Sequence, residues 1–202
     1  MLRDINNLFR YNSKAALTSK HNIHEGFNQH NHILMNHILR PWNGKDLNNL
    51  VKHANNINIA KFLTDEFPYP YTTEKGKQFI AYACNANPTH IFAIEVNGEA
   101  AGGIGIHQQH GIMRKNAELG YWLSETYWGN GIISKAILQM VEYGFKTFDI
   151  TRIYARPFGN NIASKRVLEK AGFKLEACIK DGIIKNNEIQ DELIYAVRKT
   201  EG

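Results

Sequence analysis

The residues best suited to bind a charged ligand lie in one segment, from residue 121 to residue 133. It reads Tyr-Trp-Leu-Ser-Glu-Thr-Tyr-Trp-Gly-Asn-Gly-Ile-Ile, so a strand-like run leads through a loop with two glycines, Gly129 and Gly131, directly into a helix. Unpaired amides converge at such a helix start and, assisted by the helix dipole, favour an anion. Because glycines let a phosphate approach the backbone, the segment predicts a phosphate-binding loop.

Two other phosphate-binding motifs are missing from the chain. The segment lacks the Gly-Lys-Ser/Thr of a nucleoside triphosphate P-loop, and no Gly-x-Gly-x-x-Gly is present. Neither an ATPase nor a dinucleotide-binding fold is therefore favoured. A Gly-x-Gly before a helix is by itself as often a turn as a binding loop, so its interpretation depends on the rest of the chain.

Histidines and cysteines are the other residues of catalytic or metal-binding type. His107 and His110, at the end of a predicted strand, would act as bases or would simply be exposed loop histidines. Cys84 and Cys178 have neither CxxC nor metal-ligand spacing, which favours buried thiols in a reducing, cytoplasmic setting. Five histidines near the N-terminus lack an accompanying cysteine or carboxylate constellation, so we expect no metal site. They are His21, His24, His30, His32 and His37.

Strand-like and helix-like runs alternate around the glycine-rich segment. The predicted strands cover residues 37–42, 91–96, 99–107, 117–123, 151–156, 173–180 and 188–197, and the predicted helices cover 46–54, 58–63, 73–84, a long stretch from 132, and 161–171. Asn97–Gly98 predicts a hairpin turn and Gly172 a left-handed helix end, and a turn region that contains Asp181–Gly182 is expected between the last two strands. The order predicts a single mixed α/β domain with a central sheet of about seven strands and helices on both faces.

Two of these elements position the glycine-rich loop. In the strand before it, Glu118 and Trp122 share one face, while Leu119, Tyr121 and Leu123 share the other. In the helix after it, apolar residues recur at helical spacing, which predicts that this stripe packs on the sheet.

Composition narrows the class of protein. The chain has 202 residues, the size of one domain with a short appendage, and 43% hydrophobic against 21% charged residues is typical of a soluble globular protein. The net charge of +5 suits a polyanionic ligand but lacks the dense basic patch of a nucleic-acid-binding protein. Polar residues interrupt every apolar run, so we expect no membrane span and no signal peptide.

Residues 1–34 differ from the rest of the chain because they are rich in Asn, His, Lys and Ser and keep no helical or strand period. We expect a poorly ordered polar extension of a domain that covers residues 35–202. Because Met35 stands just before the first predicted strand, residues 1–34 would lie upstream of the native start, or would act as a weak transit signal.

Several stretches, taken in order, form a recognisable pattern. They are Ile-Leu-Arg-Pro-Trp at 38–42, Phe-Pro-Tyr-Pro-Tyr at 67–71, Ala-Glu-Leu-Gly-Tyr-Trp-Leu at 117–123, Tyr-Trp-Gly-Asn-Gly at 127–131, the run 160–173, Asp-Gly at 181–182 and Asp-Glu-Leu-Ile-Tyr at 191–195. Together they resemble the GNAT superfamily of acetyl-CoA-dependent N-acetyltransferases, and within it the group of ribosomal-protein N-terminal acetyltransferases RimJ and RimL. The resemblance covers about residues 37–199.

The resemblance implies a binding site for acetyl-CoA as cosubstrate. The family cradles the coenzyme A pyrophosphate on backbone amides of its loop, here those of Trp128, Gly129, Asn130, Gly131, Ile132 and Ile133. The preceding strand splays from the next parallel strand, so Trp122 and Leu123 would offer backbone groups to pantetheine, and an amide near Leu123 would stabilise the oxyanion. The family pattern begins with Gln or Arg and ends with a small residue, whereas this chain has Trp128 and Ile133.

The resemblance also implies direct attack of a primary amine on the thioester, without an acetyl-enzyme. Glu118 would relay a proton from the amine through water, or would be a solvated or substrate-orienting carboxylate. Ser164 matches the serine that this group places near the thiol, where it would protonate the leaving sulfur, or it would stabilise its own helix start. Asn161 would cap that helix or bind the pantetheine amide.

The acceptor amine is less defined by the sequence. Phe67, Tyr69 and Tyr71 lie where the family admits its acceptor, and they would line a substrate slot or pack on the core. The acceptor would be a protein N-terminal amine or a small amine such as a polyamine or an antibiotic. An alternative on the same fold is a non-catalytic acyl-CoA-binding or regulatory module. Family analogy makes a homodimer plausible, and no metal, nucleic acid or membrane partner is expected.

Overall fold

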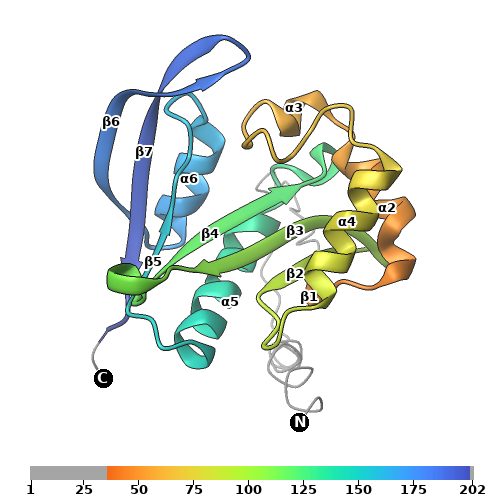
Figure 1. Ribbon diagram of the computed structural model, residues 1–202, viewed down its shortest axis with the longest axis horizontal. Helices are drawn as coiled ribbons and strands as arrows, with labels where there is room; N and C mark the ends of the chain where they lie inside the picture. The colour runs from red at the N-terminus through yellow and green to blue at the C-terminus, as the bar shows by residue number, and fades with distance from the viewer. Residues whose placement is uncertain (1–35, 201–202) are drawn as a thin grey trace, which may run out of the picture.

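Seven strands form one mixed sheet, in the order β1-β2-β3-β4-β5-β7-β6, in the computed structural model of the protein (Figure 1). The structure describes residues 36–200. The strands are β1 (His37–Pro41), β2 (Ile91–Val96), β3 (Glu99–Gln108), β4 (Asn116–Leu123), β5 (Arg152–Ala155), β6 (Lys174–Lys185) and β7 (Glu188–Arg198). The α-helices are α2 (Leu47–Ala54), α3 (Ile57–Ala60), α4 (Thr73–Cys84), α5 (Ile132–Thr147) and α6 (Ile162–Lys170), and the 3-10 turns are η1 (Gly44–Asp46), η2 (Gly111–Met113) and η3 (Glu125–Tyr127).

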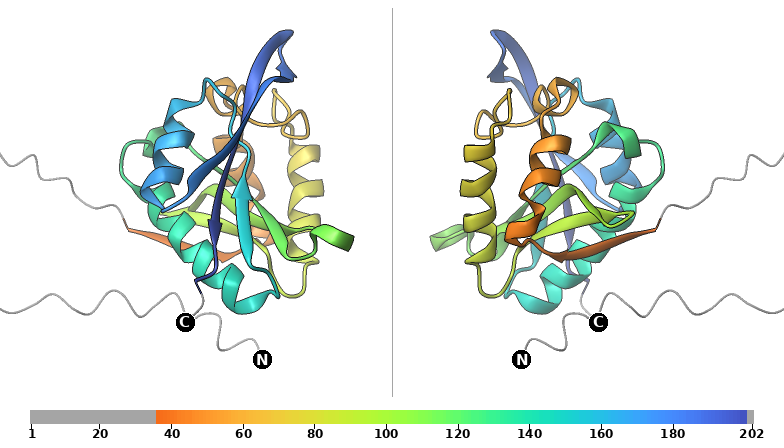
Figure 2. Two further views of the ribbon diagram at one scale, coloured as in Figure 1. Left: turned by 90° about the vertical axis from the view of Figure 1, so that its left-hand side faces the viewer. Right: turned by 90° about the vertical axis from the view of Figure 1, so that its right-hand side faces the viewer.

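Helices cover both faces of the sheet, as the sequence predicts. On one face, α5 and α6 bury residues such as Ile137, Met140 and Leu168 in the larger core. On the other face, α2 and α4 contribute Leu50 and Ile80 to a second core. The two side views show the sheet between these layers (Figure 2). The predicted mixed α/β domain is therefore confirmed.

The sheet opens between β4 and β5. These two strands are parallel, and they pair only where residues Asn116–Glu118 face residues Arg152–Tyr154. Beyond Glu118 the two strands diverge (Figure 1). Among the described strands, none pairs with residues 119–123 on the β5 side, although β3 pairs with β4 as far as Leu123. The end of β4 therefore has one free edge.

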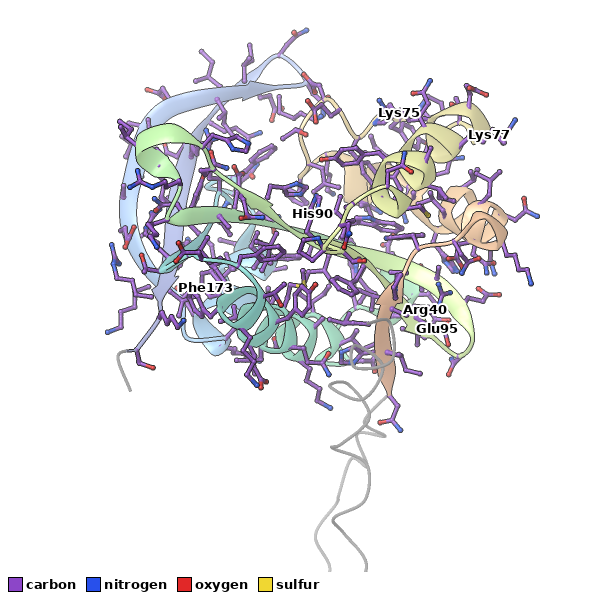
Figure 3. All side chains as sticks on the ribbon, turned by 60° about the horizontal axis from the view of Figure 1, so that its bottom comes forward. Arg40, Lys75, Lys77, His90, Glu95 and Phe173 are labelled. Atoms are coloured by element: carbon purple, nitrogen blue, oxygen red, sulfur yellow. The ribbon has the colours of Figure 1, made fainter. Side chains whose placement is uncertain are left out.

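A buried carboxylate fixes the first helices to the edge of the sheet. Arg40 of β1 donates two N–H bonds of 2.7 Å to Asp46 and also pairs with Glu95 of β2 (Figure 3). Asp46 is only 4% exposed, and it also accepts the Asn43 N–H, at 3.0 Å, before η1. The bond to Asp46 is the main reason why the pKa of Arg40 is raised. This network fixes where α2 begins.

The turn between the last two strands is shorter than predicted. Asp181–Gly182 does not join the last two strands but lies inside β6, where the register against β7 shifts between Ile179 and Ile183. The turn is Asn186–Asn187, whose φ angles of +51° and +63° fit a left-handed two-residue hairpin. Asp181 also has a positive φ, +52°, so the Asp-Gly pair forms an irregularity in an edge strand, a place where bulges are common. The predicted left-handed residues at Asn97–Gly98 and Gly172 are confirmed.

Other details of the prediction need correction. Cys84 and Cys178, predicted to be buried, are both exposed, because Cys84 is the last residue of α4 and Cys178 lies on the edge strand β6. The helix predicted over 58–63 spans only Ile57–Ala60. What was predicted for residues 1–34 lies outside the described residues. Between residues 36 and 200, no helix is long and apolar enough to cross a membrane.

The β3–β4 contact leaves no room for a side chain at Gly102. A Cβ there would lie 2.6 Å from the Trp122 carbonyl oxygen and 3.2 Å from the Leu123 Cα, both backbone atoms. We expect Gly102→Ala to lower the free energy of unfolding by about 1–3 kcal/mol, as overpacking does. Chemical denaturation measures this change. Gly44→Ala, whose Cβ meets nothing within 4 Å, is the control, and an equal effect of both substitutions would contradict the prediction.

Candidate functional site

A cavity of about 430 Å³ occupies the opening between β4 and β5, which is a usual size for a small-molecule site. Its wall combines the free edge of β4, the glycine-rich loop with the start of α5, the end of β5, one side of α6, and α3 with the loop that follows. The sequence-predicted residues in this wall are Glu118, Trp122, Leu123, Trp128, Gly129, Gly131, Ile132, Ile133, Asn161 and Ser164. Segments far apart in sequence thus meet at one place.

The glycine-rich loop presents open backbone to this cavity. Gly129 and Gly131 have φ angles of +78° and +72°, and a Cβ on either would meet nothing within 4 Å. Gly131 is the N-cap of the 16-residue α5 and provides no side chain to cap it. The first amides of α5 therefore lack a capping side chain, and the positive end of the helix dipole faces the cavity.

Side chains fix the shape of the loop. The Trp128 Nε1–H donates to the Leu123 carbonyl at 2.8 Å, which joins the loop to the end of β4. The Asn130 side chain donates to the carbonyls of Tyr127 (3.2 Å) and Trp128 (3.1 Å). Asn130 is not among the described residues that line the cavity, so its amide group holds the loop from within. Its predicted contact with a cofactor stays a prediction.

At the end of β4, Leu123 and Trp122 have different roles. The Ser124 N–H donates to the Ala101 carbonyl at 2.8 Å, and backbone groups along an antiparallel strand alternate in direction. Trp122, the register partner of Gly103, therefore directs its peptide groups toward β3, and Leu123 directs its own toward the cavity. The prediction that Trp122 offers backbone groups to the ligand is wrong in this respect, although its side chain lines the cavity.

A hydroxyl pair spans the cavity wall. Tyr121 Oη and Ser164 Oγ are 2.7 Å apart, which joins β4 to the first turn of α6. Burial raises the pKa of Tyr121, so its phenol stays protonated. Asn161 is the N-cap of α6 and accepts the Ser164 N–H at 3.0 Å, as predicted for a capping residue. The Ser164 hydroxyl contacts Tyr121 across the opening.

A carboxylate and a guanidinium lie near the point where β4 and β5 part. The Tyr154 hydroxyl donates to Glu118 at 3.4 Å, and burial followed by the Glu118 charge raises the pKa of Tyr154. Arg156 pairs at 2.7 Å with Glu192, which is 7% exposed, and this bond is the main reason why the pKa of Arg156 is raised. A positive and a negative side chain thus lie on the same cavity wall.

Comparison with known proteins decides the family. Residues 36–174 match the family model described as "Acetyltransferase (GNAT) domain". The chain belongs to the GNAT family. The uncharacterized N-acetyltransferase YoaA of Bacillus subtilis (strain 168) is 36% identical over 104 residues, which are 50% of this chain and 56% of YoaA.

Two further similar proteins extend the comparison. The ribosomal-protein-serine acetyltransferase of Escherichia coli (strain K12) is 33% identical over 84 residues, 42% of this chain and 47% of that protein, in line with the RimJ/RimL-like group. The chain thus spans about half the length of these curated relatives. The structure of the microcin C7 self immunity acetyltransferase MccE in complex with acetyl-CoA and AMP has a TM-score of 0.70 and 25% identity, covering 81% of this chain and 92% of that one.

The aromatic residues predicted to meet the acceptor lie behind the wall of this GNAT site. The Phe67 ring contacts those of Tyr71 and Trp122, with centroids 5.0 and 5.7 Å apart. Tyr71 is buried, which raises its pKa to about 12, while Tyr69 is exposed. None of the three is among the described residues that line the cavity. The structure therefore favours core packing for Phe67 and Tyr71, and acceptor contact stays a prediction.

Two histidines, His107 on β3 and His110 in the loop after it, were candidate bases. Neither is among the described residues that line the cavity. His107 is half-buried beside His90, with ring centroids 5.8 Å apart, and burial lowers its pKa. His110 is exposed. The same described part of the chain holds no group of three or more His, Cys, Asp or Glu that could bind a metal.

Sequence reasoning missed several cavity residues. Tyr121 alternates with Leu119 and Leu123 and therefore resembles a core residue, and only its contact with Ser164 distinguishes it. Arg156 follows β5 at the point where the sheet opens, a signal that needs the topology. Phe62, Leu63 and Thr64 replace the aromatic loop as the wall beside α3, and no motif marks them.

Tyr121 is expected to ionise at a higher pH than an ordinary tyrosine, because burial disfavours the phenolate. The phenolate absorbance is measured against pH in the wild-type protein and in Tyr121→Phe. The two curves should coincide up to about pH 10, the ordinary tyrosine value, and separate only above it. Because the folded pKa is raised, the free energy of unfolding should fall as the pH rises through this range. Separation below pH ~10 would show that Tyr121 is not buried.

Proposed function

We propose that the protein transfers an acetyl group from acetyl-CoA to the N-terminal α-amine of a protein or peptide, by direct attack in a ternary complex. The observation that carries this proposal is the free edge of β4 at Leu123, which lies between an open glycine-rich helix start and the carboxylate of Glu118. A thioester bound along this edge would meet the pyrophosphate loop at one end and the acceptor amine at the other.

The cofactor half of the cavity suits coenzyme A. The amides after Gly131 and the α5 dipole favour the pyrophosphate, and open space at Gly129 and Gly131 lets it approach the backbone. Lys170, on the α6 wall, adds a positive charge for a polyanionic ligand. The free peptide groups of β4 would pair with the amides of pantetheine, as a strand edge pairs with an extended chain. The acetyl-CoA complex of the similar MccE structure supports this assignment.

The chemistry needs a neutral amine, an oxyanion site and a proton for the leaving group. The amine nitrogen attacks the thioester carbonyl, and the Leu123 N–H would stabilise the charge that develops on its oxygen. Glu118 would take the proton that the amine loses, directly or through water. When the C–S bond breaks, the Ser164 hydroxyl, held by Tyr121 at 2.7 Å, would give a proton to the thiolate and regain one from water, and Glu118 would release its proton to water. The products are an acetylated amine and free coenzyme A.

Charge in the acceptor half favours a peptide N-terminus over a polyamine. Among the described residues that line the cavity, Glu118 is the one acid, and in the acceptor half it lies on the same wall as the basic Arg156. A polyamine carries several cations and needs several carboxylates. A peptide N-terminus has a single amine followed by carbonyl groups, which Glu118 and Arg156 together would bind. The E. coli relative is named for a ribosomal-protein serine, which supports the same acceptor class.

Three further proposals follow the same assignment. The free thiols of Cys84 and Cys178 support a cytoplasmic location. A homodimer remains a proposal from family analogy. The alternative function is a non-catalytic acyl-CoA-binding module, which would keep cofactor affinity and have no turnover.

Binding of acetyl-CoA is expected to depend on Gly131. Gly131→Glu places a side chain and a negative charge in the phosphate cradle, so isothermal titration calorimetry should show affinity at least ~10-fold weaker than in the wild type. Gly98→Glu is the matched control, because Gly98 also has a positive φ, +82°, and open space around it, but lies in the β2–β3 hairpin. Equal affinities in the two variants, or no binding by the wild type, would contradict the cofactor site.

Turnover is expected to depend on Glu118 and Ser164. Glu118→Gln and Ser164→Ala should each lower kcat, Glu118→Gln by roughly 100-fold, because a proton acceptor or donor is lost, while acetyl-CoA affinity is unchanged. The assay follows coenzyme A release with a free N-terminal peptide, the same peptide blocked at its N-terminus, and spermidine. Glu142→Gln, an exposed change on α5, is the control. Turnover of spermidine but not of the free peptide would overturn the acceptor class, and binding without any turnover would favour the non-catalytic module.

A further inference from the structure

A buried serine and a buried histidine are connected by hydrogen bonds to each other and to a partly exposed glutamate, behind the end of β4. His53 of α2 has its Nδ1 atom 3.0 Å from Ser124 Oγ and its Nε2 atom 2.8 Å from Glu99 Oε2. His53 is only 9% exposed and Ser124 only 5% exposed. None of the three residues is among those between 36 and 200 that line the cavity. The network therefore lies outside the cavity.

Glu99 fixes which ring nitrogen of His53 carries a proton. Hydrogen bonds from Lys52 and then from His53 lower the pKa of Glu99, so the carboxylate is ionised and only accepts. The His53 Nε2 atom must then be the donor in that bond. The Nδ1 atom, on the other side of the ring, is left to bond the Ser124 hydroxyl.

A serine, a histidine and an acid connected by hydrogen bonds in this order also form the catalytic triad of many hydrolases. The burial of Ser124 argues against a nucleophilic role here. Its hydroxyl faces α2, and its neighbours Leu123 and Tyr127 form the cavity wall instead. A serine nucleophile needs its oxygen within reach of the thioester carbon. The network is consequently suited to holding the chain in place.

Ser124 connects the end of β4 to the glycine-rich loop. Its N–H donates to Ala101 at 2.8 Å, and its carbonyl accepts the Tyr127 N–H at 3.0 Å, which begins η3. Leu123, the residue before it, has its carbonyl bound to the Trp128 side chain. The His53 bond adds the side-chain anchor that comes from α2. Movement of Ser124 would therefore move the peptide groups of Leu123.

We propose that His53 is a positioning residue for acetyl transfer, which holds Ser124 from α2 and thereby fixes the Leu123 amide where the thioester carbonyl binds. This inference rests on the proposed function. The oxyanion site stabilises the transition state only if its donor is already in place, so a small shift of Leu123 affects the chemical step. Binding of the pyrophosphate, farther along the loop, is much less sensitive to the same shift.

A second link from the same region of the chain is exposed and weaker. Asn56 and Asn58, which flank the start of α3, donate to Glu125 at 2.7 and 3.1 Å. Exposed polar contacts contribute little to rigidity because water competes with them. The buried His53–Ser124 bond is the stronger anchor, since its partners have no ready exchange with solvent.

Two substitutions separate the contacts of the His53 ring. Asparagine places a polar atom near the Nδ1 position and keeps the contact with Ser124, whereas glutamine places one near Nε2 and keeps the contact with Glu99. We expect kcat to fall on the order of tenfold in His53→Gln and His53→Ala and to stay near the wild-type value in His53→Asn, with the acceptor KM unchanged. Lys52→Ala is the control, because it removes only the exposed partner of Glu99.

A double substitution tests whether His53 acts through Ser124. Ser124→Ala should reproduce the loss in His53→Ala, and the double variant should lose no more than either single variant. Thermal denaturation of every variant separates a loss of folded protein from a loss of turnover. Equal kcat values in His53→Asn and His53→Gln, or additive losses in the double variant, would overturn the positioning role.

Isothermal titration calorimetry tests the role of His53 without an assay of turnover, because it measures only the binding of the cofactor. His53→Ala should bind acetyl-CoA several-fold more weakly than the wild type but bind coenzyme A equally well, since only the acetyl carbonyl contacts the Leu123 amide. If the wild type binds acetyl-CoA but turns over no amine, the proposed function fails and this comparison still decides the role of His53. An unchanged ratio of the two affinities in His53→Ala would overturn the inference.

Discussion

The site depends on one constraint, which is that β4 and β5 pair over only three residues. A parallel strand normally has its peptide groups bonded on both sides, but β4 continues to Leu123 with β3 on one side alone. The peptide groups on this edge have no strand partner, so they are available to an extended ligand that carries its own amides. A cavity bounded by such an edge is suited to an extended ligand, and the helix start at Gly131 adds a preference for its anionic end.

The opening persists because side chains hold each of its edges from a different direction. Trp128 and Ser124 hold the end of β4 from the loop and from α2, and Tyr121 joins it to Ser164 on α6. On the β5 side, Arg156 is fixed by the buried Glu192 of β7. Each contact joins elements that are distant in sequence, so the cavity has a defined shape only when both cores are complete.

Short-range sequence patterns predict α4 and the glycine-rich loop well, but they predict the β6–β7 hairpin poorly. The bounds of α4 agree with the sequence because Thr72 caps it and its apolar residues keep a helical period. Asp181–Gly182 and Asn186–Asn187 both tolerate left-handed backbone, and only the pairing of β6 with β7 decides which of them is the turn. The glycine-rich loop was predictable for a related reason, since positive φ angles at Gly129 and Gly131 are a local requirement of glycine.

The two halves of the cavity differ in how far a sequence can describe them. Coenzyme A would be bound largely by peptide groups, whose positions follow from glycines, helix starts and strand ends. The acceptor half is built from side chains of α3, its following loop and the end of β5, and the β6–β7 hairpin reaches that loop through the pair of Lys185 and Asp65, 2.7 Å apart. Its character depends on which charges the tertiary fold brings together, and the proximity of Glu118 to Arg156 is visible only in three dimensions.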